Sequence, residues 1–145
     1  MIRVLIVEDE PTVRRAIARA LGSHGWAVEQ AGSVGRAVEL IAQGVFDCAI
    51  LDIDLPDGTG VELAKRLQQA GRTERVIFFS GASDPELLAE ASRLATSVHK
   101  SEGVDCLVEV AVRELRDLPR SQACVRSAFT ESEAPSGSGR PGRRG

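Results

Sequence analysis

Five polar side chains stand where predicted strands end, and their types suit phosphoryl transfer assisted by a divalent cation. Glu8 and Asp9 follow one apolar run, and Asp52 follows another. Ser80 and Lys100 close two later strand-like segments. A carboxylate can act as a nucleophile and form an acyl phosphate. The transferring group then needs a metal, a cation and a hydrogen-bond donor to meet its negative charge.

The three acids carry the metal prediction. Carboxylates that share a crevice repel one another, and each is costly there without a cation. Mg²⁺ takes about six oxygen ligands and usually keeps several waters, so two carboxylates and a backbone carbonyl suffice. Taken alone, residues 8–10 also fit a solvated acidic loop. Taken alone, Lys100 fits a surface lysine and Ser80 a strand-end cap.

Strands and helices alternate along residues 2–118. Apolar runs and short alternating segments predict five strands, at Ile2–Val7, Trp26–Ala31, Phe46–Leu51, Val76–Phe79 and Thr96–His99. Helical spacing and caps predict five helices, opening at Pro11, after Ser33, near Val61, at Asp84-Pro85 and near Val104, with the last ending at about Leu118.

This alternation is typical of an α/β fold, a doubly wound parallel sheet with helices on both faces. In such folds ligands bind at the carboxyl ends of the strands. The five polar side chains are therefore expected along one edge of the sheet.

Composition sets the expected limits of the domain. Residues 1–119 carry 13 Lys and Arg against 19 Asp and Glu, a net charge of −6, which disfavours binding of nucleic acid. Residues 120–145 are basic and end in a Ser/Gly/Pro/Arg-rich run, predicted to be a largely disordered tail with no second domain. No secretory signal or membrane span is evident, so a cytoplasmic protein is expected.

Four motifs in order resemble response-regulator receiver domains of the chemotaxis and transcriptional-regulator type. They are V-E-D-E-P at 7–11, L-D-I-D-L-P-D-G-T-G at 51–60, F-S-G-A at 79–82 and the lone Lys100. The resemblance covers about residues 1–118. It implies a flavodoxin-like (βα)5 fold with strand order 2-1-3-4-5.

The resemblance also implies residue roles. Asp52 would be the phosphoacceptor of a two-component phosphorelay. Mg²⁺ would be held by Glu8, Asp9 and Asp52 with the backbone carbonyl of Asp54. Ser80 would be the switch hydroxyl and Lys100 the phosphate-binding cation, while Pro56 and Gly60 match the turn after the acceptor. The donor would be a sensor histidine kinase or phosphotransfer protein, and output would pass to an unknown protein target.

Three positions depart from the family pattern. Ser97 stands where an aromatic residue is usual, and Ser101 where proline is usual, often in a cis bond. Asp54 adds a carboxylate where many relatives have an apolar or amide side chain. Ser97 has no aromatic ring that could change position on phosphorylation. Phosphorylation is therefore expected to change the backbone of Gly81–Asp84 more than that of Ser97–Glu102.

Two other functions remain open. A phosphorylation-independent receiver-like module would bind proteins without the chemistry. A phosphatase of the haloacid-dehalogenase type would use Asp52 as nucleophile and Asp54 as general acid, since D-x-D also resembles its motif. That family places D-x-D after its first strand and Thr four residues after the nucleophile, where this chain has Pro56. Turnover as an enzyme is not expected.

Overall fold

The computed structural model describes residues 1–116. Residues 1–115 form one compact unit of alternating strands and helices. The elements are β1 (Arg3–Val7), α1 (Pro11–Gly22), β2 (Ala27–Ala31), α2 (Val34–Ile41), β3 (Phe46–Leu51), β4 (Asp54–Leu55), β5 (Gly58–Thr59), α3 (Gly60–Gln69), β6 (Thr73–Ser80), α4 (Pro85–Leu94), β7 (Thr96–His99), a 3-10 turn (Lys100–Glu102) and α5 (Gly103–Arg116).

Five parallel strands form the sheet, in the order β2-β1-β3-β6-β7. Counted along the sheet strands alone, this is the expected order 2-1-3-4-5. Val7 pairs with Leu51, so the residues that follow them lie side by side. Ser80 pairs with His99, so Lys100 begins just beyond Ser80. The register thus brings all the predicted strand ends to one edge.

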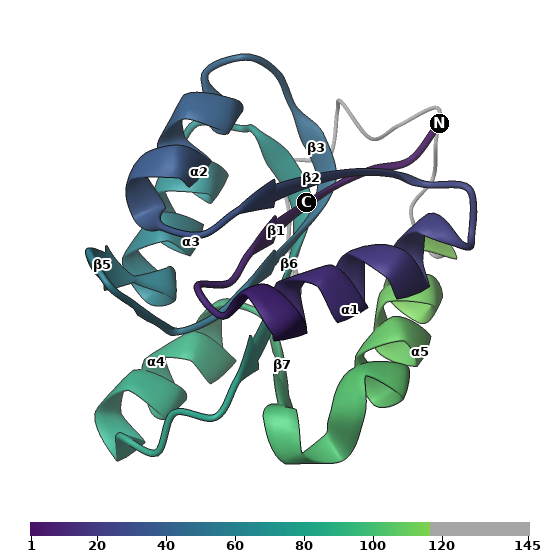
Figure 1. Cartoon of the computed structure of the whole chain (residues 1–145). Helices are drawn as coiled ribbons and strands as arrows, with labels where there is room; N and C mark the ends of the chain where they lie inside the picture. The colour runs from purple at the N-terminus through teal and green to yellow at the C-terminus, as the bar shows by residue number, and fades with distance from the viewer. Residues whose placement is uncertain (117–145) are drawn as a thin grey trace, which may run out of the picture. The chain divides into compact units, whose positions relative to one another are not determined.

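Helices cover both faces of this sheet, with α1 and α5 on one side and α2, α3 and α4 on the other (Figure 1). Successive side chains of a strand point to opposite faces, so a strand covered on both sides is apolar throughout. The face toward α2, α3 and α4 buries Leu5, Val7, Ala49, Leu51 and Phe78. The intervening residues Val4, Ile6, Cys48, Ile50 and Ile77 are also buried, as are Ile17 and Leu21 of α1 and Leu107 and Ala111 of α5.

Helix starts follow the predicted caps. The Ser33 side chain accepts a hydrogen bond from the Arg36 amide at 3.1 Å, which opens α2. Asp84 accepts from the Glu86 amide at 2.9 Å, and Pro85 takes the first helical position of α4. These side chains satisfy amides that have no partner inside the first turn.

The first two strands begin one residue later than predicted, β1 at Arg3 and β2 at Ala27, and three larger differences follow. β6 begins at Thr73 rather than Val76, because Thr73 pairs with Phe46 at the start of β3. The predicted loop after Asp52 contains a small antiparallel hairpin, β4–β5. A 3-10 turn separates β7 from α5. The predicted tail, 120–145, and the domain boundary at 119 lie outside the described residues.

Within residues 1–116, no helix has the length and apolar character needed to cross a membrane.

Candidate functional site

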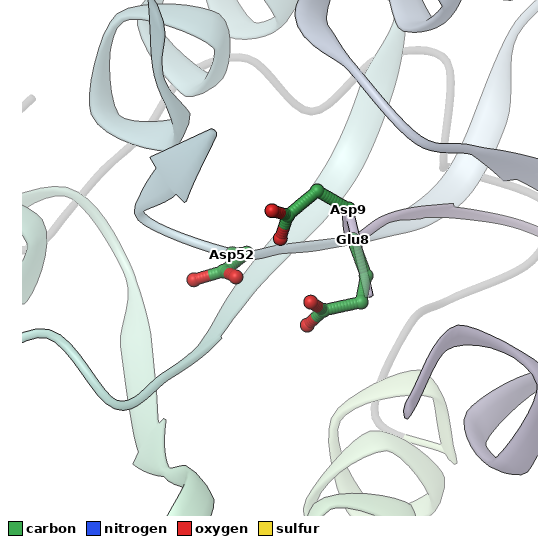
Figure 2. A group of neighbouring side chains, drawn as sticks. All are labelled: Glu8, Asp9 and Asp52. Carbon is green, nitrogen blue, oxygen red and sulfur yellow. The ribbon is translucent and has the colours of Figure 1, made fainter. Parts of the chain in front are cut away.

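Glu8, Asp9 and Asp52 meet where β1 and β3 end. One carboxylate oxygen from each lies within 4.8 Å of the others. Figure 2 shows the three side chains gathered around one space between the strand ends. The backbone fixes this meeting, because the Asp52 amide donates to the Val7 carbonyl at 2.9 Å. The predicted acid cluster is therefore present as a spatial group.

Lys100 bridges the two buried acids of the cluster. Its Nζ lies 2.9 Å from Oε1 of Glu8 and 3.1 Å from Oδ2 of Asp52. Glu8 is 2% exposed and Asp52 5% exposed, whereas Asp9 faces solvent. Buried charges need partners. The Lys100 ammonium balances one of three carboxylate charges, so the cluster still attracts a further cation.

Burial and pairing act in opposite directions on the titration of this group. Burial raises the pKa of Glu8, and the Asp52 charge adds to this, while the Lys100 ammonium and the Glu10 amide oppose it. For Lys100, burial by itself would lower the pKa, but the hydrogen bonds to Glu8 and Asp52 raise it overall. Lys100 is thus held as a cation beside Asp52.

The donor set fits Mg²⁺. All three candidate ligands are carboxylate oxygens, the hard donors that Mg²⁺ prefers, and exposed Asp9 leaves room for retained waters. The amide of Asp54 donates to Oδ1 of Asp52 at 3.3 Å, which places residue 54 beside the cluster. Ligation by the Asp54 carbonyl remains a prediction.

Ser80 closes β6 at the same edge. Its side chain is buried, and its Oγ accepts a hydrogen bond from the Ala82 amide at 3.1 Å. A Cβ atom added to Gly81 would lie 3.9 Å from Cδ of Lys100, so the lysine stem passes close to the residue after Ser80. Ser80 and Lys100 thus lie at the ends of neighbouring strands, as the register predicts.

Gly60 is required because its backbone packs closely against the backbone of Asp52. A Cβ atom at this position would lie 2.0 Å from the carbonyl oxygen of Asp52. The Gly60 amide also donates to the Ile53 carbonyl at 2.8 Å. A residue without a side chain allows this approach. Pro56 lies in the exposed turn between β4 and β5.

Two supporting features were not predicted from the sequence. Arg14 of α1 donates to the Glu8 carbonyl at 2.8 Å and so fixes the loop that carries the acid pair. Nδ1 of His99 accepts from the Ser101 amide at 3.1 Å, and Glu102 accepts from the His99 amide at 3.4 Å. This reciprocal cap shapes the Lys100 turn without proline, and the spacing of His99 and Glu102 was its signal.

The departures at Ser97 and Ser101 lie on exposed surface. Ser97 is exposed on β7, opposite Phe78 in the register. Ser101 is exposed in the 3-10 turn, and no cis peptide bond occurs within the described part of the chain. Neither residue contributes to the acid cluster.

Asp9→Asn is expected to stabilise the fold and weaken the metal site together. The change removes one negative charge from a cluster with excess negative charge, so we expect the free energy of unfolding without divalent ions to rise by about 0.5 kcal/mol. The dissociation constant for Mg²⁺ should rise by about tenfold or more, because ligand charge sets affinity. Urea unfolding with and without Mg²⁺ measures both.

Glu29→Gln is the matched control, because it removes the same charge at an exposed position of β2. It should leave the Mg²⁺ affinity unchanged. A destabilised Asp9→Asn with wild-type Mg²⁺ affinity would show that Asp9 is not part of a cation site.

Comparisons with known proteins agree with this arrangement. Residues 4–110 match the response regulator receiver domain profile. The transcriptional regulatory protein DltR of Streptococcus agalactiae is 36% identical over 81 residues, which are 56% of this chain and 36% of that protein. The transcriptional activator protein ExaE of Pseudomonas putida is 34% identical over 90 residues, 61% of this chain and 42% of that protein. The chain thus spans less than half the length of these two relatives.

Solved structures show the same fold. A CheY-like response regulator receiver domain protein from Methanospirillum hungatei has a TM-score of 0.73 at 25% identity, covering 81% of this chain and 95% of that one. TrrA from Thermotoga maritima, solved in complex with Mg²⁺-BeF, has a TM-score of 0.68 at 28% identity, covering 79% and 99%. By its sequence profile, strand order and fold, the chain belongs to the response regulator receiver domain family of two-component systems.

Proposed function

We propose that this chain accepts a phosphoryl group on Asp52 from the phosphohistidine of a sensor kinase or phosphotransfer protein. One observation supports the proposal most strongly. The buried carboxylate of Asp52, at the end of a strand, accepts a hydrogen bond from Lys100 and lies close to the carboxylates of Glu8 and Asp9. The phosphorylated state then signals through altered contacts with a protein target. Mg²⁺ is the proposed cofactor, held by these three acids and the Asp54 carbonyl.

The chemistry needs little beyond positioning and charge. An Asp52 carboxylate oxygen forms a bond to phosphorus, and the bond between phosphorus and the donor nitrogen breaks. The electron pair of the broken bond stays with the donor nitrogen, which takes up a proton. Lys100 exchanges its contact with Asp52 for one with a phosphoryl oxygen, and the Ser80 hydroxyl donates to another. Bound Mg²⁺ would supply further neutralisation of the phosphoryl charge.

Uptake of phosphorus tests the proposal directly. The chain is incubated with acetyl phosphate, and its intact mass is measured with Mg²⁺ and with a chelator. We expect a gain of one phosphoryl group with Mg²⁺ and almost none with the chelator. No gain in either condition would favour the phosphorylation-independent module. That module stays an alternative because Ser97 and Ser101 replace the usual aromatic residue and proline, and it ranks second because all five chemical residues are present.

Hydrolysis of a chromogenic phosphate ester separates the phosphatase alternative. A receiver takes up one phosphoryl group and loses it by its own slow hydrolysis, so we expect no sustained turnover of the ester. Continuous turnover that depends on Asp52 and Asp54 would make the chain an enzyme instead.

Phosphorylation is expected to change the NMR shift of the Ala82 amide most. The Ser80 hydroxyl accepts from this amide at 3.1 Å, and a hydroxyl that turns toward a phosphoryl group gives up that bond. Ser97 offers no ring to carry the change into β7. Amide NMR shifts on adding Mg²⁺ and beryllofluoride should therefore be larger at residues 81–84 than at residues 97–102.

Ser80→Ala is the control, because it removes the acceptor oxygen of the Ala82 amide. The shift at Ala82 should shrink in this variant while shifts near Asp52 persist. Changes centred on residues 97–102 in the wild type would mean that the output route does not begin at Ser80.

A further inference from the structure

The side chain of Asp57 joins two segments that lie far apart in the sequence. Its Oδ1 accepts from the Val34 amide at 2.8 Å, and its Oδ2 accepts from the Gly35 amide at 2.9 Å. Asp57, which accepts both hydrogen bonds, lies in the β4–β5 turn, and the two donor amides lie in the first turn of α2. One carboxylate thus ties the loop after the phosphoacceptor to a helix on one face of the sheet.

The first turn of α2 depends on both this tie and its own cap. The first amides of any helix lack partners within the helix. Asp57 serves the Val34 and Gly35 amides, and Ser33 serves the amide of Arg36. The two contacts are charge-assisted and place a negative charge at the positive end of the helix dipole. The same two amides lower the pKa of Asp57, so the carboxylate is ionised at neutral pH.

The hairpin rests on α2 through a second contact. A Cβ atom at Gly58 would lie 3.2 Å from Cγ2 of Val34, which shows how closely the turn approaches the helix. Within the hairpin, Asp54 pairs with Thr59. The Asp54 amide in turn donates to Oδ1 of Asp52. Asp57 is therefore linked through a two-rung hairpin to the residue beside the phosphoacceptor.

We propose that Asp57 is a positioning residue that holds the β4–β5 hairpin on α2 and thereby keeps residue 54 in place beside Asp52 and the acid cluster. This inference rests on the proposed function, because the metal site includes the Asp54 carbonyl. The Asp57 carboxylate bonds to amides of α2 and acts on the cluster through the hairpin. It follows that α2 responds when the metal site is filled.

Asp57→Ala and Ser33→Ala form a matched pair. Each removes side-chain acceptors from the first turn of α2, but Asp57→Ala alone also frees the hairpin. A role in helix stability would be common to both variants. Only Asp57→Ala should also disturb the position of residue 54. A comparison of the Mg²⁺ affinities of the two variants, made under conditions of equal fold stability, therefore separates the two roles.

The experiment follows Mg²⁺ titration by amide NMR on the whole chain in three forms, the wild type, Asp57→Ala and Ser33→Ala. In the wild type we expect shifts at residues 8–10 and 52–54 and a smaller response at Val34 and Gly35. In Asp57→Ala, the Mg²⁺ dissociation constant should rise by about tenfold, as when an outer-shell partner of a metal ligand is lost. The amide shifts at Val34 and Gly35 should vanish in this variant. In Ser33→Ala, the Mg²⁺ affinity and these shifts should both remain as in the wild type.

The outcomes separate the two proposals. A wild-type chain without any Mg²⁺ response would refute the proposed function and this inference with it. A normal wild-type response with equal Mg²⁺ affinity in Asp57→Ala would overturn the inference alone. Asp57→Asn covers the case in which Asp57→Ala fails to fold, because its amide oxygen can still accept one of the two bonds. It should give an intermediate affinity, and wild-type affinity there would also overturn the inference.

Discussion

Asp52→Asn is expected to take up no phosphoryl group under conditions that label the wild type. An amide is not a nucleophile toward phosphorus at neutral pH, and an acyl phosphate requires a carboxylate oxygen. Asp52 is the buried acid of the L-D-I-D-L motif and carries the contact with Lys100. Intact mass after incubation with acetyl phosphate and Mg²⁺ measures the loss.

Asp54→Asn is the matched control for this result. It makes the same change two residues later, at an exposed side chain in the same loop. It should still be labelled, and decay of its label compared with that of the wild type measures how the extra carboxylate affects the lifetime of the acyl phosphate. Labelling that persists in Asp52→Asn and disappears in Asp54→Asn would move the acceptor to residue 54.

Gly60→Ala is expected to destabilise the fold by about 3 kcal/mol, at the upper end of the usual range for overpacking. The new methyl carbon would stand 2.0 Å from the Asp52 carbonyl oxygen, so backbone rather than a flexible side chain must move. The displaced segment carries Asp52, the proposed phosphoacceptor, so the rate of labelling should fall as well. Urea unfolding and phosphoryl uptake measure the two effects.

Gly22→Ala provides the control for the glycine substitution. Gly22 ends α1, and a Cβ atom there would meet nothing within 4 Å. This change is expected to be neutral or stabilising by about 0.5 kcal/mol, because alanine restricts the unfolded chain. Equal stability of the two variants would contradict the close approach of Gly60 to Asp52.

Much of the fold could be predicted because burial and capping leave local signals. A strand covered on both faces reads as a continuous apolar run, and Phe46–Leu51 was predicted with the bounds it has in the structure. Asp84-Pro85 marks a helix start whose side-chain cap forms as expected. The polar start of β6 could not be found this way, because no apolar run marks it. Thr73 belongs to the strand because it pairs with Phe46.

The residues of the site also fall into those that the sequence could place and those that it could not. Residues at strand ends could be placed because parallel strands bring their carboxyl ends together, and Glu8, Asp9 and Asp52 do meet. Arg14 and Asp57 act through contacts with backbone groups of other elements. Such contacts depend on the three-dimensional docking of a helix or hairpin, and a carboxylate or guanidinium on an exposed turn or helix looks the same in sequence with or without them.

We expect Glu8, Asp9 and Asp52 to act together as a divalent-cation site around the proposed phosphoacceptor. Titration of the chain with Mg²⁺, followed by amide NMR, measures this binding residue by residue. We expect saturable shifts concentrated at residues 8–10 and 52–54, with no comparable change at Gly44 and Val45, which precede β3 at the opposite edge of the sheet. Amide shifts at residues 8–10 and 52–54 that stay unchanged as Mg²⁺ is added would contradict a cation site at these three acids.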